Sequence, residues 1–296
     1  MMKKIFVLLL IVISVSSCEK NIDFVTNKTE DILVVDGIIE DTQEPQIVLT
    51  HSLNYFASIN PQIALNSFVH NAVITINNGT ITSTLKEYEV PLGNGYSLFY
   101  YRNDSTNPAQ KIIGEQGKKY DLKIIVDGKE YTSSTLIPFY TKKCDSLWSK
   151  PAPSSKDSTL AIVTGKFTDP VGLGNYIRYF TKVNNGPFWA GENSSFDDQV
   201  VDGKTYSVQI EQGIDRNNPP QNFDTKGFFK KGDTVTLKFC NNDKATFTFW
   251  NTWEFAFQAI GNPFSTPNKV LGNISNGALG AFCGYAVGYK KIVIPK

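Results

Sequence analysis

The chain has 296 residues, of which 41% are hydrophobic and 19% are charged, with 29 basic and 28 acidic side chains. A near-neutral balance without clusters of lysine and arginine excludes the electrostatic surface that nucleic-acid binding requires, and it excludes a basic patch for anionic lipids. The length suits one large domain or two ordinary domains with hydrophobic cores, and two domains are our interpretation.

The first 18 residues have the pattern of a bacterial lipoprotein signal. Lys3 and Lys4 precede an apolar run, residues 5–13, that is shorter than the roughly 20 residues a membrane-spanning helix needs. Small residues then lead to Cys18, which matches the lipobox at which signal peptidase II cleaves. We predict a signal peptide over residues 1–17 and lipidation of Cys18. The alternative is an ordinary signal with an incidental cysteine.

Residues 18–30 are polar and predict a tether between the lipid and the folded protein. Removal of residues 1–17 leaves 27 basic and 28 acidic residues, so the lipid is the expected anchor in the outer membrane. Glu19, followed by Lys20 after the predicted lipidation site, is a weak example of an acidic signal for export to the cell surface. The periplasmic face and the cell surface therefore both stay open.

From residue 32 onward, short alternating or β-branched runs recur at regular intervals, as expected for an all-β fold. Asn78-Gly79 and Asp127-Gly128 are the dipeptides that type I′ hairpin turns need, because both central residues take a positive φ. Tyr120 lies where the corner tyrosine of immunoglobulin-like domains bonds back to the backbone. We predict an immunoglobulin-like β-sandwich over residues 31–138.

Pro138 and the proline- and serine-rich residues 142–158 predict an irregular boundary. Strand patterns then resume, and we predict an antiparallel, barrel-like (calycin-like) domain over residues 139–296 that ends in two closing strands. One helix is predicted between Asp243 and Ala259, because Asn242 or Asp243 can serve as an N-cap and Gly261 follows the end. A strand is the alternative here, since a helix would be apolar on almost all sides.

Three cysteines follow Cys18, namely Cys144, Cys240 and Cys283. An exported protein permits a disulfide between Cys240 and Cys283, but the odd count leaves one thiol free. The favoured interpretation is that all three are small buried side chains. Cysteine spacing and the two histidines predict no zinc site, and we expect no cofactor.

The second half of the chain carries an ordered set of short motifs. They include Phe167-Thr-Asp169-Pro170, Gly174-Asn175-Tyr176-Ile-Arg178, Phe196-Asp-Asp198, Gly203-Lys204-Thr-Tyr206, Gly232-Asp233-Thr-Val235, Gly261-Asn262-Pro263-Phe264 and the run from Asn273 to Tyr285. With the lipobox, they resemble the Bacteroidetes lipoprotein family of domain of unknown function 4249 (DUF4249). Cys283 departs from that pattern, where glycine is common. Members are often encoded beside TonB-dependent receptors, which implies a receptor as partner, and the family supplies no catalytic residues.

Four aromatic residues are the candidate ligand-binding residues. They are Trp189, Trp250, Trp253 and Phe264. Phe264 opens a loop of about twenty residues, and long ordered loops are usually functional. Exposed aromatic side chains near such a loop supply contact area for a glycan, another small molecule or a partner protein. If these side chains are buried, they belong to the core.

The acidic residues allow two further hypotheses. Asp169, Asp197, Asp198 and Asp202 resemble the oxygen-rich sets that bind calcium, but their spacing fits no EF-hand loop. We favour a role in capping turns and predict no metal site. Glu192 and Glu211 are candidates for the acid and base of a glycosidase, but such pairs are recognised by their separation in space.

The sequence therefore predicts a non-enzymatic, lipid-anchored outer-membrane protein, accessory to a TonB-dependent receptor in nutrient capture or uptake. An envelope hydrolase that uses Glu192, Glu211 or Asp198 is one alternative, and a structural or adhesive surface protein is another. A pocket lined by aromatic residues in the second domain favours ligand capture. A closed barrel with a flat exposed patch favours protein contact.

Overall fold

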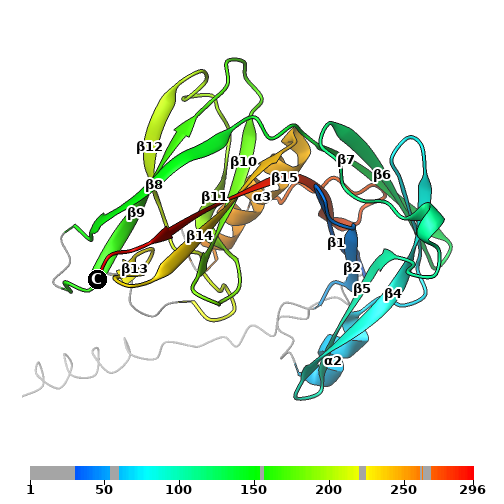
Figure 1. Cartoon of the computed structure of the whole chain (residues 1–296). Helices are drawn as coiled ribbons and strands as arrows, with labels where there is room; N and C mark the ends of the chain where they lie inside the picture. The colour runs from blue at the N-terminus through cyan, green and yellow to red at the C-terminus, as the bar shows by residue number, and fades with distance from the viewer. Residues whose placement is uncertain (1–30, 54–59, 154–156, 220–224, 261, 263–267) are drawn as a thin grey trace, which may run out of the picture. The chain divides into compact units, whose positions relative to one another are not determined.

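The computed structural model describes residues 31–53, 60–153, 157–219, 225–260, 262 and 268–296. The predicted signal peptide, the lipidation site Cys18 and the tether lie outside these residues. Strands dominate the described parts of the chain (Figure 1), so the prediction of an all-β fold is confirmed. None of the described helices has the length and apolar character needed to cross a bilayer.

Seven strands of the first half form one continuous, curled sheet. They are β1 (Leu33–Glu40), β2 (Gln46–His51), β3 (Val73–Asn77), β4 (Thr82–Gly93), β5 (Tyr96–Asn103), β6 (Lys118–Val126) and β7 (Lys129–Ile137). Their hydrogen-bonded order is β1-β2-β5-β4-β3-β6-β7. Alternate apolar side chains such as Ile39, Ile74 and Ile124 meet in one core, because successive residues of a strand point to opposite faces.

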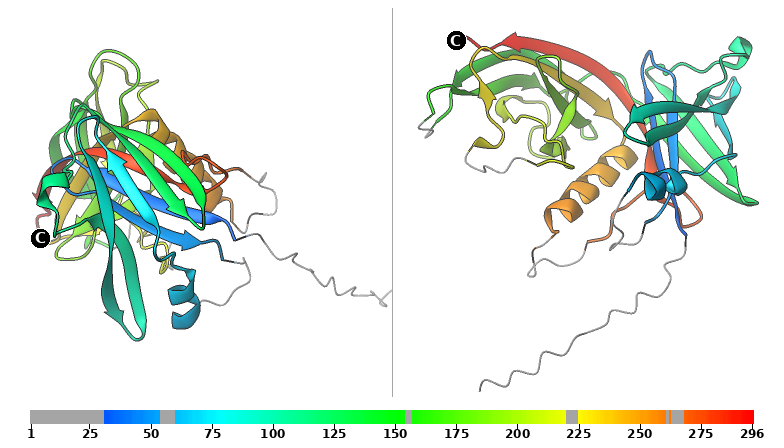
Figure 2. Two further views of the ribbon diagram at one scale, coloured as in Figure 1. Left: turned by 90° about the vertical axis from the view of Figure 1, so that its right-hand side faces the viewer. Right: turned by 90° about the horizontal axis from the view of Figure 1, so that it is seen from below.

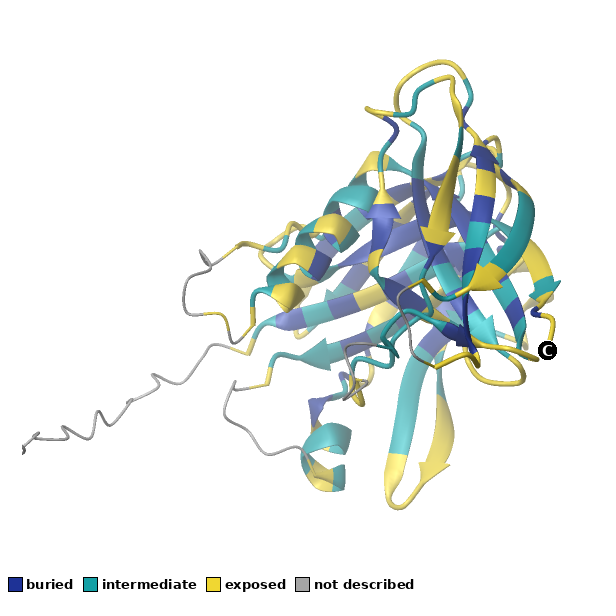
Figure 3. Ribbon diagram, turned by 90° about the vertical axis from the view of Figure 1, so that its left-hand side faces the viewer, coloured by how far each residue is buried: buried dark blue, intermediate teal, exposed yellow. Residues whose placement is uncertain are grey.

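Short helical segments lie in the connections between these strands. Helix α2 (Pro61–Ser67) follows β2 and was not predicted from the sequence, although Asn60 caps it through a bond from the Ile63 N–H and Pro61 occupies its first turn. The segment η1 (Pro108–Gln110) lies between β5 and β6. The long hairpin of β4 and β5 exposes its tip, including Leu92 (Figure 3).

Of the two predicted type I′ turns, one has the expected backbone conformation and the other does not. Asp127 and Gly128 have φ values of 50° and 72°, as a type I′ turn needs, so that prediction is confirmed. At Asn78-Gly79 only Gly79 has a positive φ, and the Asn78 side chain instead accepts the Ile81 N–H. This turn is therefore not type I′, because Asn78 lacks the positive φ that such a turn needs. The bond to the Asn78 side chain stabilises the turn instead.

The corner tyrosine is also confirmed. The Tyr120 hydroxyl accepts the Glu115 N–H at 2.7 Å and lies 3.4 Å from the Ile113 carbonyl, while its ring is fully buried. The hydroxyl thus fastens the segment before β6 to the core that β6 enters.

Eight strands form the second half. They are β8 (Lys143–Pro151), β9 (Leu160–Thr168), β10 (Tyr176–Val183), β11 (Trp189–Phe196), β12 (Thr205–Ile210), β13 (Phe229–Lys230), β14 (Thr234–Asn242) and β15 (Leu279–Val293). Strands β11-β10-β14-β15 continue the sheet that begins at β1, and a smaller sheet contains β12-β9-β13 with β8 paired to β9. Both sheets are open, with β11 and β12 at their edges.

Strand β8 lies in the stretch that we predicted to be irregular. Its residues pair with β9 from Lys143↔Thr168 to Pro151↔Ala161. The prediction of irregular chain is therefore wrong for these residues: pairing with a neighbour stabilises the strand, and its proline stands at the strand end, where a missing N–H is tolerated. The domain boundary itself stays a prediction.

The last strand joins the two halves. Strand β15 pairs in parallel with β1 up to Glu40↔Tyr285, and from Asn242↔Tyr285 onward it pairs antiparallel with β14. The two predicted closing strands are thus one strand, which Figure 2 shows in red beside the blue β1. A Cβ at Gly284 would lie 2.9 Å from the Leu136 carbonyl oxygen of β7, so glycine permits this close approach.

Helix α3 (Lys244–Gln258) confirms the predicted helix. Asp243 accepts the Thr246 N–H at 2.8 Å as the N-cap, and Phe249 is buried while Phe255 is 60% exposed. The helix packs on β10, β11 and β15 (Figure 1). All three described cysteines are buried and free, as the favoured interpretation expected.

Candidate functional site

A cavity of about 510 Å³ lies between the two sheets of the second half. Its walls come from β9, β10 and β14, from the two edge strands β11 and β12, and from the connection after β11. Because β11 pairs only with β10 and β12 pairs only with β9 in the described chain, no ladder of backbone hydrogen bonds joins the sheets on this side. Just beyond β12, however, the Ile214 N–H donates to the Ala190 carbonyl of β11 at 3.0 Å.

Aromatic side chains dominate the cavity wall. They are Phe167, Tyr179, Phe196, Tyr206 and Phe239. The Phe167 and Phe239 rings are almost fully buried and stack with their centroids 4.9 Å apart. Towards the solvent, Phe196 is 45% exposed and Val208 is 48% exposed. The cavity thus has an apolar floor and an accessible rim.

A few polar groups reach the same space, among them Asn193, Gln209 and Glu211. Burial raises the pKa of the Glu211 carboxyl, and the nearby charge of Glu192 raises it further. Burial also raises the pKa of the Tyr179 hydroxyl above its usual range. An apolar pocket with a small number of polar atoms is the composition typical of a site for a small molecule.

The predicted aromatic residues lie elsewhere. Of the three that the structure describes, Trp189 begins β11 and is 37% exposed, whereas Trp250 and Trp253 lie on α3. Trp253 lines a second cavity, of about 680 Å³, beside the segment after α3. Phe264 lies outside the described residues. None of the three tryptophans lines the aromatic cavity between the sheets.

Trp250 belongs to a buried charge cluster under α3. The guanidinium carbon of Arg178 lies 3.3 Å from the centroid of the Trp250 ring, and Glu254 lies 3.9 Å from Arg178 Nη2. Glu254 also accepts the Ser194 N–H at 2.9 Å and a bond from the Ser194 hydroxyl. Buried charges that are paired in this way hold a helix on a sheet, so we interpret this cluster as structural.

The acidic candidate residues form one pair of glutamates and one cluster of three aspartates, and Asp197 lies apart from both. Glu192 lies on β11 and pairs with Lys226 at 2.6 Å, near enough to Glu211 to affect its pKa. Asp169, Asp198 and Asp202 converge, with one oxygen of each within 4.8 Å of the others. Asp197 lines the cavity instead.

The turn-capping role predicted for these aspartates is found at Asp198 and Asp202, but not at Asp169, whose side chain accepts no hydrogen bond from the described residues. Asp198 accepts the Asn175 N–H at 2.8 Å, and Asp202 accepts the Gly172 N–H at 2.7 Å. Burial opposes the charge of Asp198, but the bonds from the N–H groups of Asn175 and Gly174 hold its pKa below the ordinary value. These bonds tie the loop after β9 to the connection after β11.

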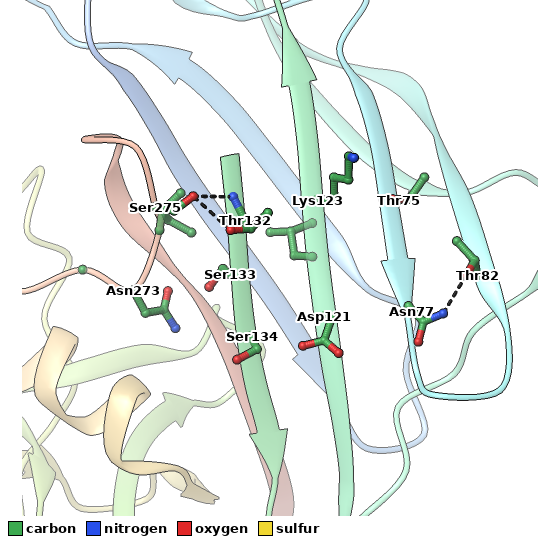
Figure 4. A pocket seen from close by; sticks show the side chains of 13 residues that line it. Thr75, Asn77, Thr82, Asp121, Lys123, Thr132, Ser133, Ser134, Asn273 and Ser275 are labelled. Carbon is green, nitrogen blue, oxygen red and sulfur yellow. Dashed lines mark hydrogen bonds between the residues drawn. The ribbon is translucent and has the colours of Figure 1, made fainter. Parts of the chain in front are cut away.

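Figure 4 shows a third concave region, a polar groove of about 870 Å³ between the sheet of the first half and residues 272–275. Side chains of Asp121, Lys123 and Ser134 project there from β6 and β7, and Ser275 accepts the Thr132 N–H at 2.7 Å. Its lining contains no aromatic side chain. The cavity between the sheets therefore fits a small molecule better, since it buries more apolar surface.

Comparison with known proteins gives one positive result. The family model described as "Domain of unknown function (DUF4249)" matches residues 19–291, which is nearly the whole chain after the predicted signal peptide. A search of the curated proteins finds no match.

Proposed function

The chain belongs to the DUF4249 family, and on that premise we propose that it is a lipid-anchored outer-membrane protein, not an enzyme, that captures a small molecule for a TonB-dependent receptor. The lipobox at Cys18 supports the anchor, and the family likeness supports an origin in Bacteroidetes. The receptor as partner is supported by the frequent gene neighbourhood of the family. One structural observation supports ligand capture above all, namely the aromatic cavity between the sheets.

The cavity wall indicates the chemistry of the ligand. Stacked rings such as Phe167 and Phe239 favour a flat or ring-bearing molecule, because aromatic faces contribute contact area with little loss of side-chain entropy. Glu211 adds a carboxyl that can bind a hydrogen-bond donor or a cationic group of the ligand. A ring-bearing small molecule with one donor group, including a sugar derivative, fits both features.

A hydrolase is the second candidate function, and the electrostatic coupling of Glu192 and Glu211 is the observation in its favour. Hydrolytic activity that is lost in Glu211→Gln and in Glu192→Gln would replace the proposal of a non-enzymatic protein. A structural or adhesive role has less support, because a deep apolar cavity is not needed for contact between proteins.

We expect Val208→Trp to block the cavity. Val208 lies at the rim and is half exposed, so a larger side chain can fill the entrance without disturbing the core. The neutral fluorescent probe N-phenyl-1-naphthylamine should bind the unaltered protein, and the variant should bind it at least about tenfold more weakly, or about 1.4 kcal/mol.

Ser207→Trp is the matched control, because Ser207 neighbours Val208 on β12 but does not line the cavity. Its probe affinity should equal that of the unaltered protein. Equal affinities in Val208→Trp and Ser207→Trp would show that the probe binds elsewhere and would remove the support from the cavity.

The receptor is tested separately by affinity purification of the tagged protein from native outer membranes. A TonB-dependent receptor should be recovered in a stoichiometric amount. Recovery of the protein without any such receptor contradicts the accessory role but leaves ligand capture intact.

A further inference from the structure

Three carboxylates converge at one end of the second half. Asp169 follows β9 directly, and Asp198 and Asp202 lie in the connection between β11 and β12. One oxygen of each lies within 4.8 Å of the other two, and Asp169 and Asp198 are each only 2% exposed. Three like charges at this separation repel one another strongly in a buried environment, so the cluster needs compensating positive charge.

One lysine compensates part of that charge. Lys142 Nζ lies 2.6 Å from Asp169 Oδ1, and both side chains are inaccessible to solvent. The nearby Lys204 ammonium donates to the Val200 carbonyl at 3.0 Å. Among the described residues, neither Asp198 nor Asp202 forms an ion pair with a lysine or arginine within 4.0 Å. One ammonium against three carboxylates leaves an excess of negative charge.

A second observation concerns the other oxygen of Asp169. The Asp169 side chain is 0% exposed, and among the described residues no hydrogen-bond donor reaches Oδ2 and no ion pair includes it. Buried carboxylate oxygens in proteins almost always have a partner, because an unpaired one loses its hydration without replacement. This orphaned oxygen belongs to one of the three clustered carboxylates.

We propose that Asp169, Asp198 and Asp202 bind a calcium ion. Calcium is a hard cation that takes six to eight oxygen ligands, and carboxylates, backbone carbonyls and water are its usual donors. Magnesium fits less well, because it demands near-ideal octahedral geometry and keeps most of its water. The ion would supply the charge that Lys142 does not.

The location gives the ion a structural consequence. Asp202 and Asp198 tie the loop after β9 to the connection between β11 and β12, because they accept the N–H groups of Gly172 and Asn175. That connection supplies Val200 and Val201 to the rim of the aromatic cavity. A bound ion would fix the rim, but the proposal stands whether or not the cavity binds a ligand.

Calorimetric titration of the detergent-solubilised mature lipoprotein, first stripped with EGTA, tests the site directly. Calcium chloride should bind with one ion per chain and raise the melting temperature, and magnesium chloride should bind at least tenfold more weakly. The absence of calcium binding overturns the proposal, and so does tighter binding of magnesium.

Asp202→Asn is the informative variant, since Asp202 is the least buried of the three and an amide oxygen can still accept the Gly172 N–H. It should keep the fold, as shown by circular dichroism, and lose at least tenfold in calcium affinity. Asp197→Asn removes the same charge nearby but outside the cluster, and its affinity should not change. Equal calcium affinities in Asp202→Asn and Asp197→Asn overturn the assignment. If Asp202→Asn does not fold, Asp198→Asn takes its place in the comparison with Asp197→Asn.

Discussion

Replacing Cys18 by alanine will abolish lipidation and the cleavage by signal peptidase II that depends on it, so the variant will keep residues 1–17. Each acyl CH₂ buried in the bilayer contributes about 0.8 kcal/mol, and a diacylglyceryl group with an amide-linked chain holds a protein stably. Because alanine has no thiol to acylate, we expect the variant to incorporate no palmitate in metabolic labelling and to migrate at the larger size of the uncleaved precursor.

Cys144→Ala is the control, because Cys144 is a buried thiol outside the lipobox. That variant should stay in the membrane fraction and incorporate palmitate. Palmitate labelling of Cys18→Ala, or its cleavage to the mature size, would place the anchor elsewhere and contradict the lipoprotein proposal. An intact mass without acyl chains on the mature protein would do the same.

Replacing Lys142 by methionine will lower the free energy of unfolding by about 3–5 kcal/mol, the usual cost of removing one partner from a buried ion pair. The variant leaves the fully buried Asp169 carboxylate without its ammonium, beside two further carboxylates. Urea denaturation in EGTA measures the effect, and the chelator keeps a divalent cation from compensating the lost charge.

Lys143→Met is the control for Lys142→Met, since Lys143 follows Lys142 in the sequence, begins β8 and is exposed. It should change the unfolding free energy by less than about 0.5 kcal/mol. Similar stabilities of the two variants would mean that the pair between Lys142 and Asp169 contributes nothing to the fold.

Local patterns predicted many of the individual elements. Alternation predicted β6 and β7, the Asp127-Gly128 pair predicted their turn, and the Asp243 cap predicted α3. Asn94-Gly95 is another turn dipeptide of this kind, although we did not predict a turn there. Its φ values of 53° and 80° form the turn between β4 and β5. These signals work because the bonds and steric limits concerned lie within a few residues.

Pairing between distant segments could not be predicted in this way. Strand β8 looked irregular because its stability comes from β9, and the parallel pairing of β1 with β15 joins residues almost a full chain length apart. The continuous course of β15 depends on small residues such as Gly284, which accept a neighbouring strand that the sequence does not identify.

The candidate sites follow the same division. The chain order makes aspartates, strand aromatics and cysteines available as candidates. Folding brings Asp169 to Asp198 and Asp202, places Phe167 and Phe239 in a cavity wall, and packs Trp250 on Arg178. Local patterns do not reveal these contacts, because a core aromatic and a cavity aromatic have the same alternation along the strand and differ only in whether the opposite sheet fills the space in front of them.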